Sequence, residues 1–132
     1  PLLPYTTLFR SKNMLAHWAH DDNAFTDDLE VWVDNFMAPG NLQGGFNWYV
    51  SAHAARMAMM KGTAPKLPPI EAPTFILWGR HDPVIKAEWA DKVDEHFMQA
   101  NVEIAEDAGH FVHYEAPDLA ATKIAAFFAT LD

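Results

Sequence analysis

The amino-acid sequence predicts an α/β fold with a parallel sheet, because its pattern changes halfway along the chain. Residues 13–62 carry apolar side chains at helical spacing. Beyond a proline-rich connector, short apolar runs alternate with helical segments in the order strand, helix, strand, helix, which is typical of a parallel sheet. Two parallel strands buried on both faces need further strands beside them, so we expect this half to be the end of a larger domain.

Composition indicates one folded domain with a substantial core. Half of the 132 residues are hydrophobic, and aromatic residues are too frequent for a disordered chain. The net charge of -9 argues against a nucleic-acid partner, which needs clustered lysine and arginine. The chain has no cysteine, and no apolar run approaches the roughly 20 residues of a membrane helix. We therefore expect a cytoplasmic protein with no membrane partner and no thiolate metal site.

The first eleven residues, 1–11, are interpreted as a non-native N-terminal scar. The stretch Tyr5 to Ser11, YTTLFRS, resembles the translation of a common sequencing adapter. Such segments are excluded from fold reasoning, and a natural N-terminal arm is the alternative. The interpretation implies that the true N-terminal part of the protein is missing.

An amphipathic helix is predicted to begin at Thr26. This residue is a good N-cap, Asp27 and Asp28 would place negative charge in the first turn, and Pro39-Gly40 would end the helix. The apolar positions follow helical spacing: Leu29, Trp32, Val33, Phe36 and Met37.

A second helix is predicted to follow the Gly44-Gly45 pair. It extends from about Asn47 to Lys61, and Gly62 is suited to cap its C-terminal end. The connector Thr63 to Pro73 comes next. We divide the chain there into a helical part, residues 12–66, and a sheet part, residues 67–132.

The sheet part contains two predicted strands and two predicted helices. Thr74 to Trp78, TFILW, is a continuous apolar run of the kind found in strands buried on both faces. A helix from Lys86 to Phe97, a strand from Val102 to Ala105 and a helix from Asp118 to Leu131 complete the pattern. Functional groups in such sheets collect in the loops after the strands.

Asp82 and His110 are the candidate catalytic residues, because each lies in a loop directly after a predicted strand. If the strands are neighbours, both loops open on one edge of the sheet. Asp82 can then accept a hydrogen bond from one nitrogen of His110, which fixes the histidine tautomer and stabilises the imidazolium. Taken singly, Asp82 could brace an Asp-Pro turn and His110 could be an ordinary loop histidine. Their occurrence in successive loops favours the catalytic interpretation.

The sheet part resembles the C-terminal end of the α/β-hydrolase fold. The resemblance lies in "APTFILWGRHDPVI" and, one helix and strand later, in "EDAGHFVHYEAPDLAATKIAAFF". In that fold the acid follows a late strand and the base follows the last one, in the chain order aspartate then histidine. The resemblance implies that Asp82 is the triad acid, that His110 is the base, and that the helical part is a partial lid.

The helical part is most similar to the lid of soluble epoxide hydrolases, up to the tripeptide "NWY". By this resemblance Tyr49 is the lid tyrosine that donates a hydrogen bond to the epoxide oxygen, and Trp48 lies beside it in the substrate site. A phenol suits this role because ring opening leaves an alkoxide that must be stabilised and protonated. These enzymes use a pair of lid tyrosines, and the other tyrosines here, Tyr5 and Tyr114, do not match the second one. Trp48 and Tyr49 could otherwise be lid packing residues.

Related dehalogenases bind halide through Trp, His or Asn donors, and "AHWAHDD" offers His17 and Trp18. We interpret Trp18 as a packing residue, because aromatic residues are mostly found in cores. The same stretch, with His20, Asp21 and Asp22, is interpreted as a solvated face because no second ligand cluster accompanies it. Neither His81, a loop neighbour of the acid, nor His113 changes that view.

The nucleophile is missing from this sequence. Members of the fold carry it on a Gly-x-Ser-x-Gly elbow or its aspartate counterpart. The only serines are Ser11, in the suspected scar, and Ser51, which has no glycine two residues to either side. We therefore expect the chain alone to be inactive and its nucleophile to have been encoded upstream.

For the intact parent, the resemblance implies a cofactor-free and metal-free epoxide hydrolase. An aspartate attacks the epoxide, Tyr49 donates to the oxygen, and His110, oriented by Asp82, activates the water that hydrolyses the alkyl-enzyme ester. The substrate would be a small and apolar molecule. The alternatives are a haloalkane or haloacetate dehalogenase, a serine esterase, or a non-catalytic half-domain whose partner chain supplies the missing N-terminal half of the sheet.

Overall fold

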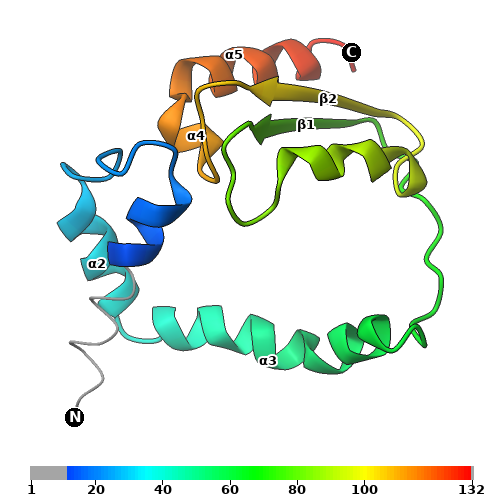
Figure 1. The fold of residues 1–132 in the computed structure, drawn as a ribbon, viewed down its shortest axis with the longest axis horizontal. Coiled ribbons are helices and arrows are strands. Elements are labelled where there is room, and N and C mark those ends of the chain that lie inside the picture. The colour runs from blue at the N-terminus through cyan, green and yellow to red at the C-terminus, as the bar shows by residue number, and fades with distance from the viewer. Residues whose placement is uncertain (1–11, 132) are drawn as a thin grey trace.

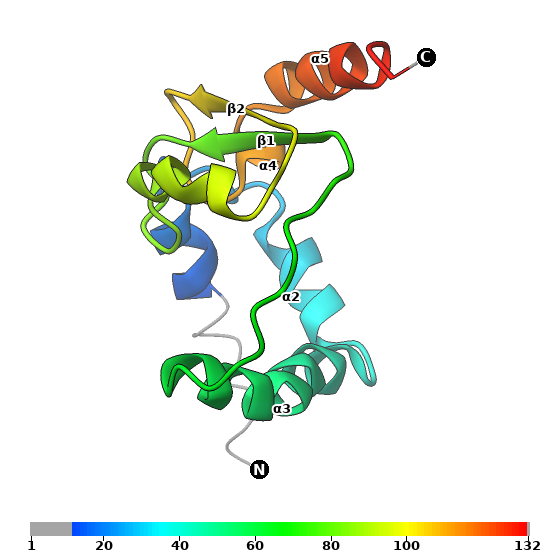
Figure 2. The same ribbon diagram turned by 90° about the vertical axis from the view of Figure 1, so that its right-hand side faces the viewer.

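A computed structural model describes residues 12–131 of the chain. Residues 41–60 and the two strands lie at opposite ends of the molecule in two perpendicular views, whereas residues 12–28 lie against the sheet part (Figures 1 and 2). In chain order, a helical segment at residues 12–18 is followed by α2 (Leu29–Met37), α3 (Asn41–Met60), β1 (Thr74–Gly79), η1 (Ala87–Glu95), β2 (Ala100–Ala105), α4 (Val112–Glu115) and α5 (Pro117–Phe128). No described helix is long and apolar enough to cross a membrane.

The two strands pair in parallel, with Thr74 opposite Ala100 at one end and Gly79 opposite Ala105 at the other. The helix α5 and the short helix η1 lie on opposite faces of this pair (Figures 1 and 2). Parallel pairing within the order strand, helix, strand, helix confirms the predicted α/β class. Because the strands are neighbours, the loops after them open on the same edge of the sheet.

Several predicted boundaries in the sheet part are wrong. The second strand begins at Ala100, two residues before the prediction. The segment predicted as one helix from Lys86 is a 3-10 helix, with i to i+3 bonds such as that from the Trp89 amide to the Lys86 carbonyl. The last helix begins at Pro117 and is preceded by the single turn of α4. The first five residues of β1 are half-buried rather than fully buried, as α5 and η1 cover the sheet only in part.

The helix α2 begins at Leu29, so the prediction of Thr26 as its N-cap is wrong. Residues 22–28 form turns, in which the Thr26 amide donates to the Asn23 carbonyl. Asp28 occupies the N-cap position but makes no side-chain capping bond. Its carboxylate instead accepts the hydroxyl hydrogen of Tyr114 at 2.5 Å. A tertiary contact therefore replaces the local cap.

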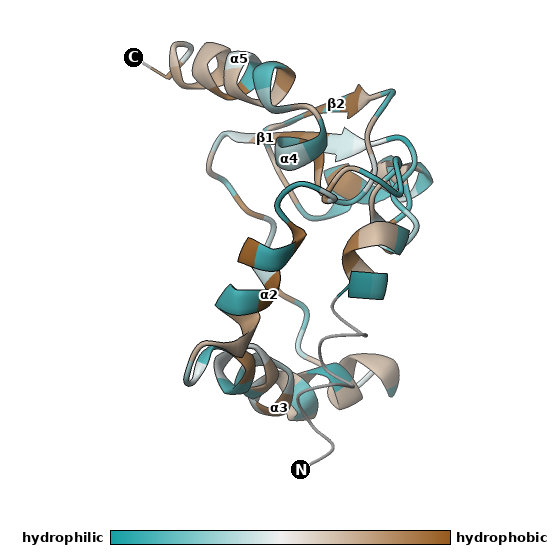
Figure 3. Ribbon diagram, turned by 90° about the vertical axis from the view of Figure 1, so that its left-hand side faces the viewer, coloured by the Kyte–Doolittle hydropathy of each residue, from teal (hydrophilic) through white to brown (hydrophobic). Residues whose placement is uncertain are grey.

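The helix α3 begins at Asn41, so Gly44 and Gly45 lie inside it rather than before it. The break falls at Gly40, whose φ of 88° is readily adopted only by glycine. Gly62 has a φ of 67° just past the helix end, which confirms its predicted position. None of the side chains of α3 is buried, and apolar and polar residues are mixed around it (Figure 3).

An aromatic cluster joins the helical part to the segment that follows β2. The ring of Phe25, 3 % exposed, stacks on Tyr114 with centroids 4.2 Å apart. It also meets the edge of Phe111 at 5.0 Å. Leu15 and Ala19 complete the buried core of this cluster. The segment that directly follows His110 therefore packs against the helical part.

The Tyr114 contact should make stability depend on pH in the alkaline range. The hydrogen bond to Asp28, with burial and the carboxylate charge, raises the pKa of Tyr114 above its ordinary value. The contact stabilises the fold fully below the unfolded tyrosine pKa of about 10 and is lost as pH rises through the higher folded-state value. Urea unfolding of the wild type and Tyr114→Phe should show a stability difference at neutral pH that shrinks above that point. A pH-independent difference would contradict this assignment.

Candidate active site

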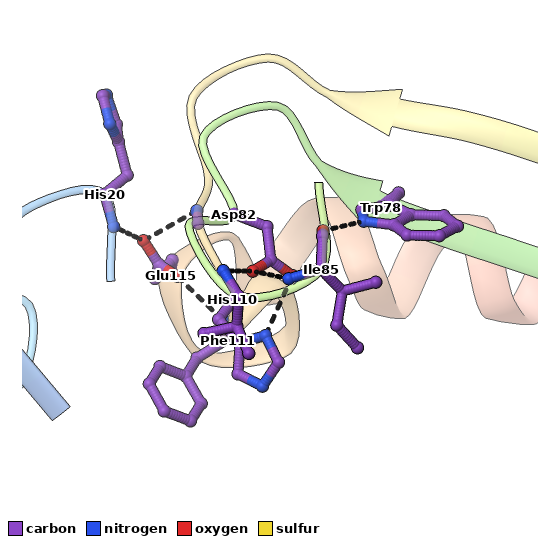
Figure 4. A network of polar contacts seen from close by, with 9 residues as sticks. His20, Trp78, Asp82, Ile85, His110, Phe111 and Glu115 are labelled. Carbon is purple, nitrogen blue, oxygen red and sulfur yellow. Dashed lines mark hydrogen bonds and ion pairs between the residues drawn. The ribbon is translucent and has the colours of Figure 1, made fainter. Parts of the chain in front are cut away.

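The acid loop, residues 80–85, follows β1 and holds Asp82 with little freedom. One carboxylate oxygen, Oδ1, accepts the backbone N–H groups of Val84 at 2.8 Å and Ile85 at 2.9 Å. The Ile85 carbonyl in turn accepts the indole N–H of Trp78 at 2.7 Å (Figure 4). Because Oδ1 is occupied, only Oδ2 of Asp82 is left to meet a partner across the loops.

The base loop, residues 106–111, follows β2 and holds His110 by its backbone. The His110 amide donates to the carbonyl of Trp18 at 2.8 Å. The Trp18 ring meets the imidazole edge-on, with centroids 5.1 Å apart. Gly109 permits this approach, because a Cβ there would lie 2.5 Å from the His20 nitrogen. The sequence therefore places glycine where two backbones touch.

The structure brings Asp82 and His110 together. Nδ1 of His110 lies 2.9 Å from Oδ2 of Asp82 (Figure 4). The Asp82 side chain is only 6 % exposed, whereas that of His110 is 24 % exposed. Nε2 makes no hydrogen bond to any residue in the described range, which leaves one ring nitrogen for a reacting group. A general base requires a carboxylate on Nδ1 and an unbonded Nε2, and the partly exposed His110 ring has both within the described part of the chain.

An ion pair braces the two loops against each other. The guanidinium of Arg80, directly after β1, donates to both carboxylate oxygens of Glu106, directly after β2, at 2.8 and 2.6 Å. This hydrogen bonding lowers the pKa of the Glu106 carboxyl below its ordinary value. The strand ladder also continues into the loops, since the Arg80 amide donates to the Ala105 carbonyl at 2.9 Å. These bonds therefore fix the loop that carries Asp82 relative to the loop that carries His110.

The two predicted lid residues lie elsewhere. Trp48 and Tyr49 are on α3, are 63 % and 54 % exposed, and pack edge-on against each other. The guanidinium of Arg56 lies over the Tyr49 ring at 5.9 Å. The helix α3 is distant from the loops that carry the base and acid (Figure 1). The structure therefore does not bring the tyrosine to His110.

The remaining histidines and acids form no metal cluster among the described residues. The rings of His20 and His81 stack with centroids 3.9 Å apart and planes 12° from parallel. Stacking occupies the ring faces and joins the helical part to the acid loop. His17 and His113 are exposed, as are Asp21 and Asp22.

Sequence reasoning missed Glu115 and assigned Trp18 and Trp78 no role in the site. Glu115 hydrogen-bonds to three backbone amides around the base loop, one of them 95 positions away. Such a contact leaves no local signal in the sequence. Gly109 and Glu115 lie six positions apart in the sequence, but this spacing does not reveal which way the Glu115 side chain points.

The parallel strand pair, with Asp82 and His110 in the loops at one edge, defines a class of α/β protein. Comparison with known proteins identifies the family. Residues 7–117 match the alpha/beta hydrolase fold family. The chain therefore belongs to this family. Asp82 after β1 and His110 after β2 stand in the chain order that this fold uses for its acid and its histidine.

Among curated relatives, the chain is similar to the 2-hydroxy-6-oxononadienedioate/2-hydroxy-6-oxononatrienedioate hydrolase of Paraburkholderia xenovorans. They are 27 % identical over 124 residues, which is 93 % of this chain and 42 % of the relative. Monoacylglycerol lipase ABHD6 of Mus musculus is 36 % identical over 62 residues, 47 % of this chain and 18 % of the lipase. The chain therefore spans less than half the length of either relative.

Among solved structures, the chain resembles Cfl2 of Burkholderia cenocepacia. The TM-score is 0.72 at 20 % sequence identity, over 96 % of this chain and 42 % of that one. At this identity the likeness supports the fold. The pairing of β1 with β2 and the helices around them therefore match a known architecture.

Proposed function

We propose that this chain supplies the general base and its orienting acid to a hydrolase of small apolar substrates. The observation that carries the proposal is the 2.9 Å contact between Nδ1 of His110 and the buried Oδ2 of Asp82. With its proton held on Nδ1, the imidazole presents a bare Nε2 to a water or hydroxyl. Residues 12–66 serve as lid and residues 67–132 as the base-bearing part of the core. The nucleophile and its oxyanion donors come from outside these residues.

One reaction that such a pair serves is epoxide hydrolysis. An aspartate nucleophile forms a C–O bond to an epoxide carbon as the ring C–O bond breaks, and Tyr49 gives its proton to the departing oxygen. His110 then removes a proton from water, which attacks the ester carbonyl and releases the diol and the aspartate, and the proton gained by His110 returns through solvent to the Tyr49 phenolate. This assignment rests on the resemblance of the "NWY" segment, with α3 closing over the site during turnover.

The second candidate is ester hydrolysis with a serine nucleophile, and the lipase relative supports the ester as substrate class. In that case His110 takes the serine proton at the first step and returns it to the leaving group. The exposure of Tyr49 also suits this reaction, which needs no lid phenol. A haloalkane or haloacetate dehalogenase would need halide donors in addition to the pair. The contacts of the Trp18 ring with His110 and Phe111 instead support a packing role for this residue.

The variant Tyr49→Phe separates the two reactions. In the complete hydrolase it should lower kcat on an epoxide by about 10²-fold, the contribution of a positioned proton donor, and leave ester hydrolysis unchanged. Phe46→Leu is the control, because it alters another exposed ring of α3 to which no site role is assigned and removes no phenol. Equal effects of Tyr49→Phe on both substrates would remove the tyrosine from the chemistry.

A further inference from the structure

Glu115, at the end of α4, accepts three hydrogen bonds from backbone amides in and beside the base loop. Its Oε1 accepts the Phe111 amide at 3.0 Å. Its Oε2 accepts the Gly109 amide at 3.0 Å and the His20 amide at 2.6 Å (Figure 4). The carboxylate therefore binds the amides immediately before and immediately after His110, together with a third from the helical part.

A helix cap explains only one of these three bonds. Glu115 lies one turn after Phe111, and a carboxylate there can reach back to the first amide of a helix. The amides of Gly109 and His20 lie outside α4, and His20 is 95 positions away. Capping α4 does not require the bonds from Gly109 and His20. The Gly109 bond fixes the backbone before His110, as the Phe111 bond fixes it after His110.

The bond to His20 links this support to the helical part. His20 follows Trp18, whose carbonyl accepts the His110 amide and whose ring meets the imidazole. Three consecutive amides, those of residues 109, 110 and 111, are thus all bound by acceptors outside the loop. Backbone N–H groups bind a carboxylate more strongly than a neutral carbonyl, so Glu115 contributes most to holding these three amides.

We propose that Glu115 is a positioning residue for the general base. It fixes the backbone conformation of residues 109–111 that brings Nδ1 of His110 to Oδ2 of Asp82. Through its bond to the His20 amide, it also links this conformation to the helical part. The inference rests on the proposed function, since positioning matters only if His110 acts as the base. Glu115 itself touches no reacting atom in this scheme.

The test is proton NMR of the 132-residue chain with labelled histidine, following the Nδ1–H of His110. In the wild type this proton should be held by Asp82 and exchange slowly with water. Glu115→Gln should speed its exchange about tenfold, the factor expected from losing one net hydrogen bond, because one amide then faces the side-chain NH₂ group. The amides of residues 20, 109 and 111 should lose protection together.

Two variants separate position from charge. Asp107→Asn removes an exposed carboxylate three residues before His110 and should leave the exchange unchanged. Glu115→Asp keeps the charge but is one methylene too short to reach the three amides, so it should behave like Glu115→Gln. Restoration of slow exchange by Glu115→Asp would show that charge alone matters and would overturn the proposal.

Wild-type measurements keep the proposal testable if the variants do not fold. Scalar couplings across the hydrogen bonds should connect the amide nitrogens of residues 20, 109 and 111 to the Glu115 carboxylate carbon, and their absence would overturn it. A wild-type His110 whose Nδ1–H is not held by Asp82 would instead overturn the proposed function. A held proton that is indifferent to Glu115→Gln would overturn only the role of Glu115.

Discussion

Replacing Asp82 by asparagine should lower kcat of the complete hydrolase by about 10⁴-fold, the loss typical of a misoriented catalytic histidine. The reason lies in the loop that holds the side chain. Two backbone N–H groups, those of Val84 and Ile85, already point at Oδ1 and will select the asparagine oxygen. The asparagine NH₂ group must then face His110 and donate to Nδ1. That contact forces the ring proton onto Nε2, so the nitrogen that should accept a proton carries one instead.

The measurement is kcat and KM of Asp82→Asn against the wild type. KM should change little, because the Asp82 side chain is buried and contacts His110, which leaves little of its surface for substrate. Asp107→Asn is the matched control, since it makes the same chemical change on an exposed residue that forms no hydrogen bond within the described part of the chain, and its kcat should stay at the wild-type value. A tenfold or smaller loss for Asp82→Asn would mean that His110 does not depend on this carboxylate.

Replacing Gly79 by alanine should destabilise the fold by about 3 kcal/mol or prevent folding, the upper range for overpacking a rigid site. A Cβ at this position would lie 2.0 Å from the Gly109 carbonyl oxygen and 2.7 Å from that of Ala108. Both neighbours are backbone atoms, so no side-chain rotation relieves the clash. The strand end would have to move away from the base loop, which separates Asp82 from His110.

Gly44→Ala is the control for this substitution. Gly44 lies inside α3, and a Cβ there would meet nothing within 4 Å. Alanine should therefore stabilise the protein by about 0.5–1 kcal/mol through its better helix propensity. Urea unfolding followed by tryptophan fluorescence measures both changes. A loss below 1 kcal/mol for Gly79→Ala would contradict the close approach of the two loops.

The Asp82–His110 pair could be predicted because it depends only on the local strand pattern and on the parallel topology of the sheet. Each residue follows a recognisable strand, and parallel neighbours bring such loops to one edge. The strand Thr74 to Trp78 was identifiable from its continuous apolar run, and the observed β1 extends it by one residue. Chain order then placed the acid before the base.

The contacts that support the pair could not be predicted, because they join residues far apart in sequence. Asp28 looked like part of a helix start, yet its carboxylate is used by Tyr114, 86 positions away. Gly44 and Gly45 looked like a break, yet Gly40 with its left-handed backbone makes the break and leaves them inside α3. Propensity is a weak prior where a tertiary contact or a better breaker competes with it.

Intact-mass analysis of His110→Gln in the complete hydrolase, mixed with an epoxide and then with an ester, tests the role of His110 most directly. Steady turnover should be lost with both substrates. If the nucleophile is aspartate, its attack on the epoxide needs no base, so a covalent adduct equal to the epoxide mass should accumulate unhydrolysed. If it is serine, no acyl adduct should form, because the first step already needs His110. Turnover by His110→Gln at the wild-type rate would show that His110 is not the base and would contradict the proposed function.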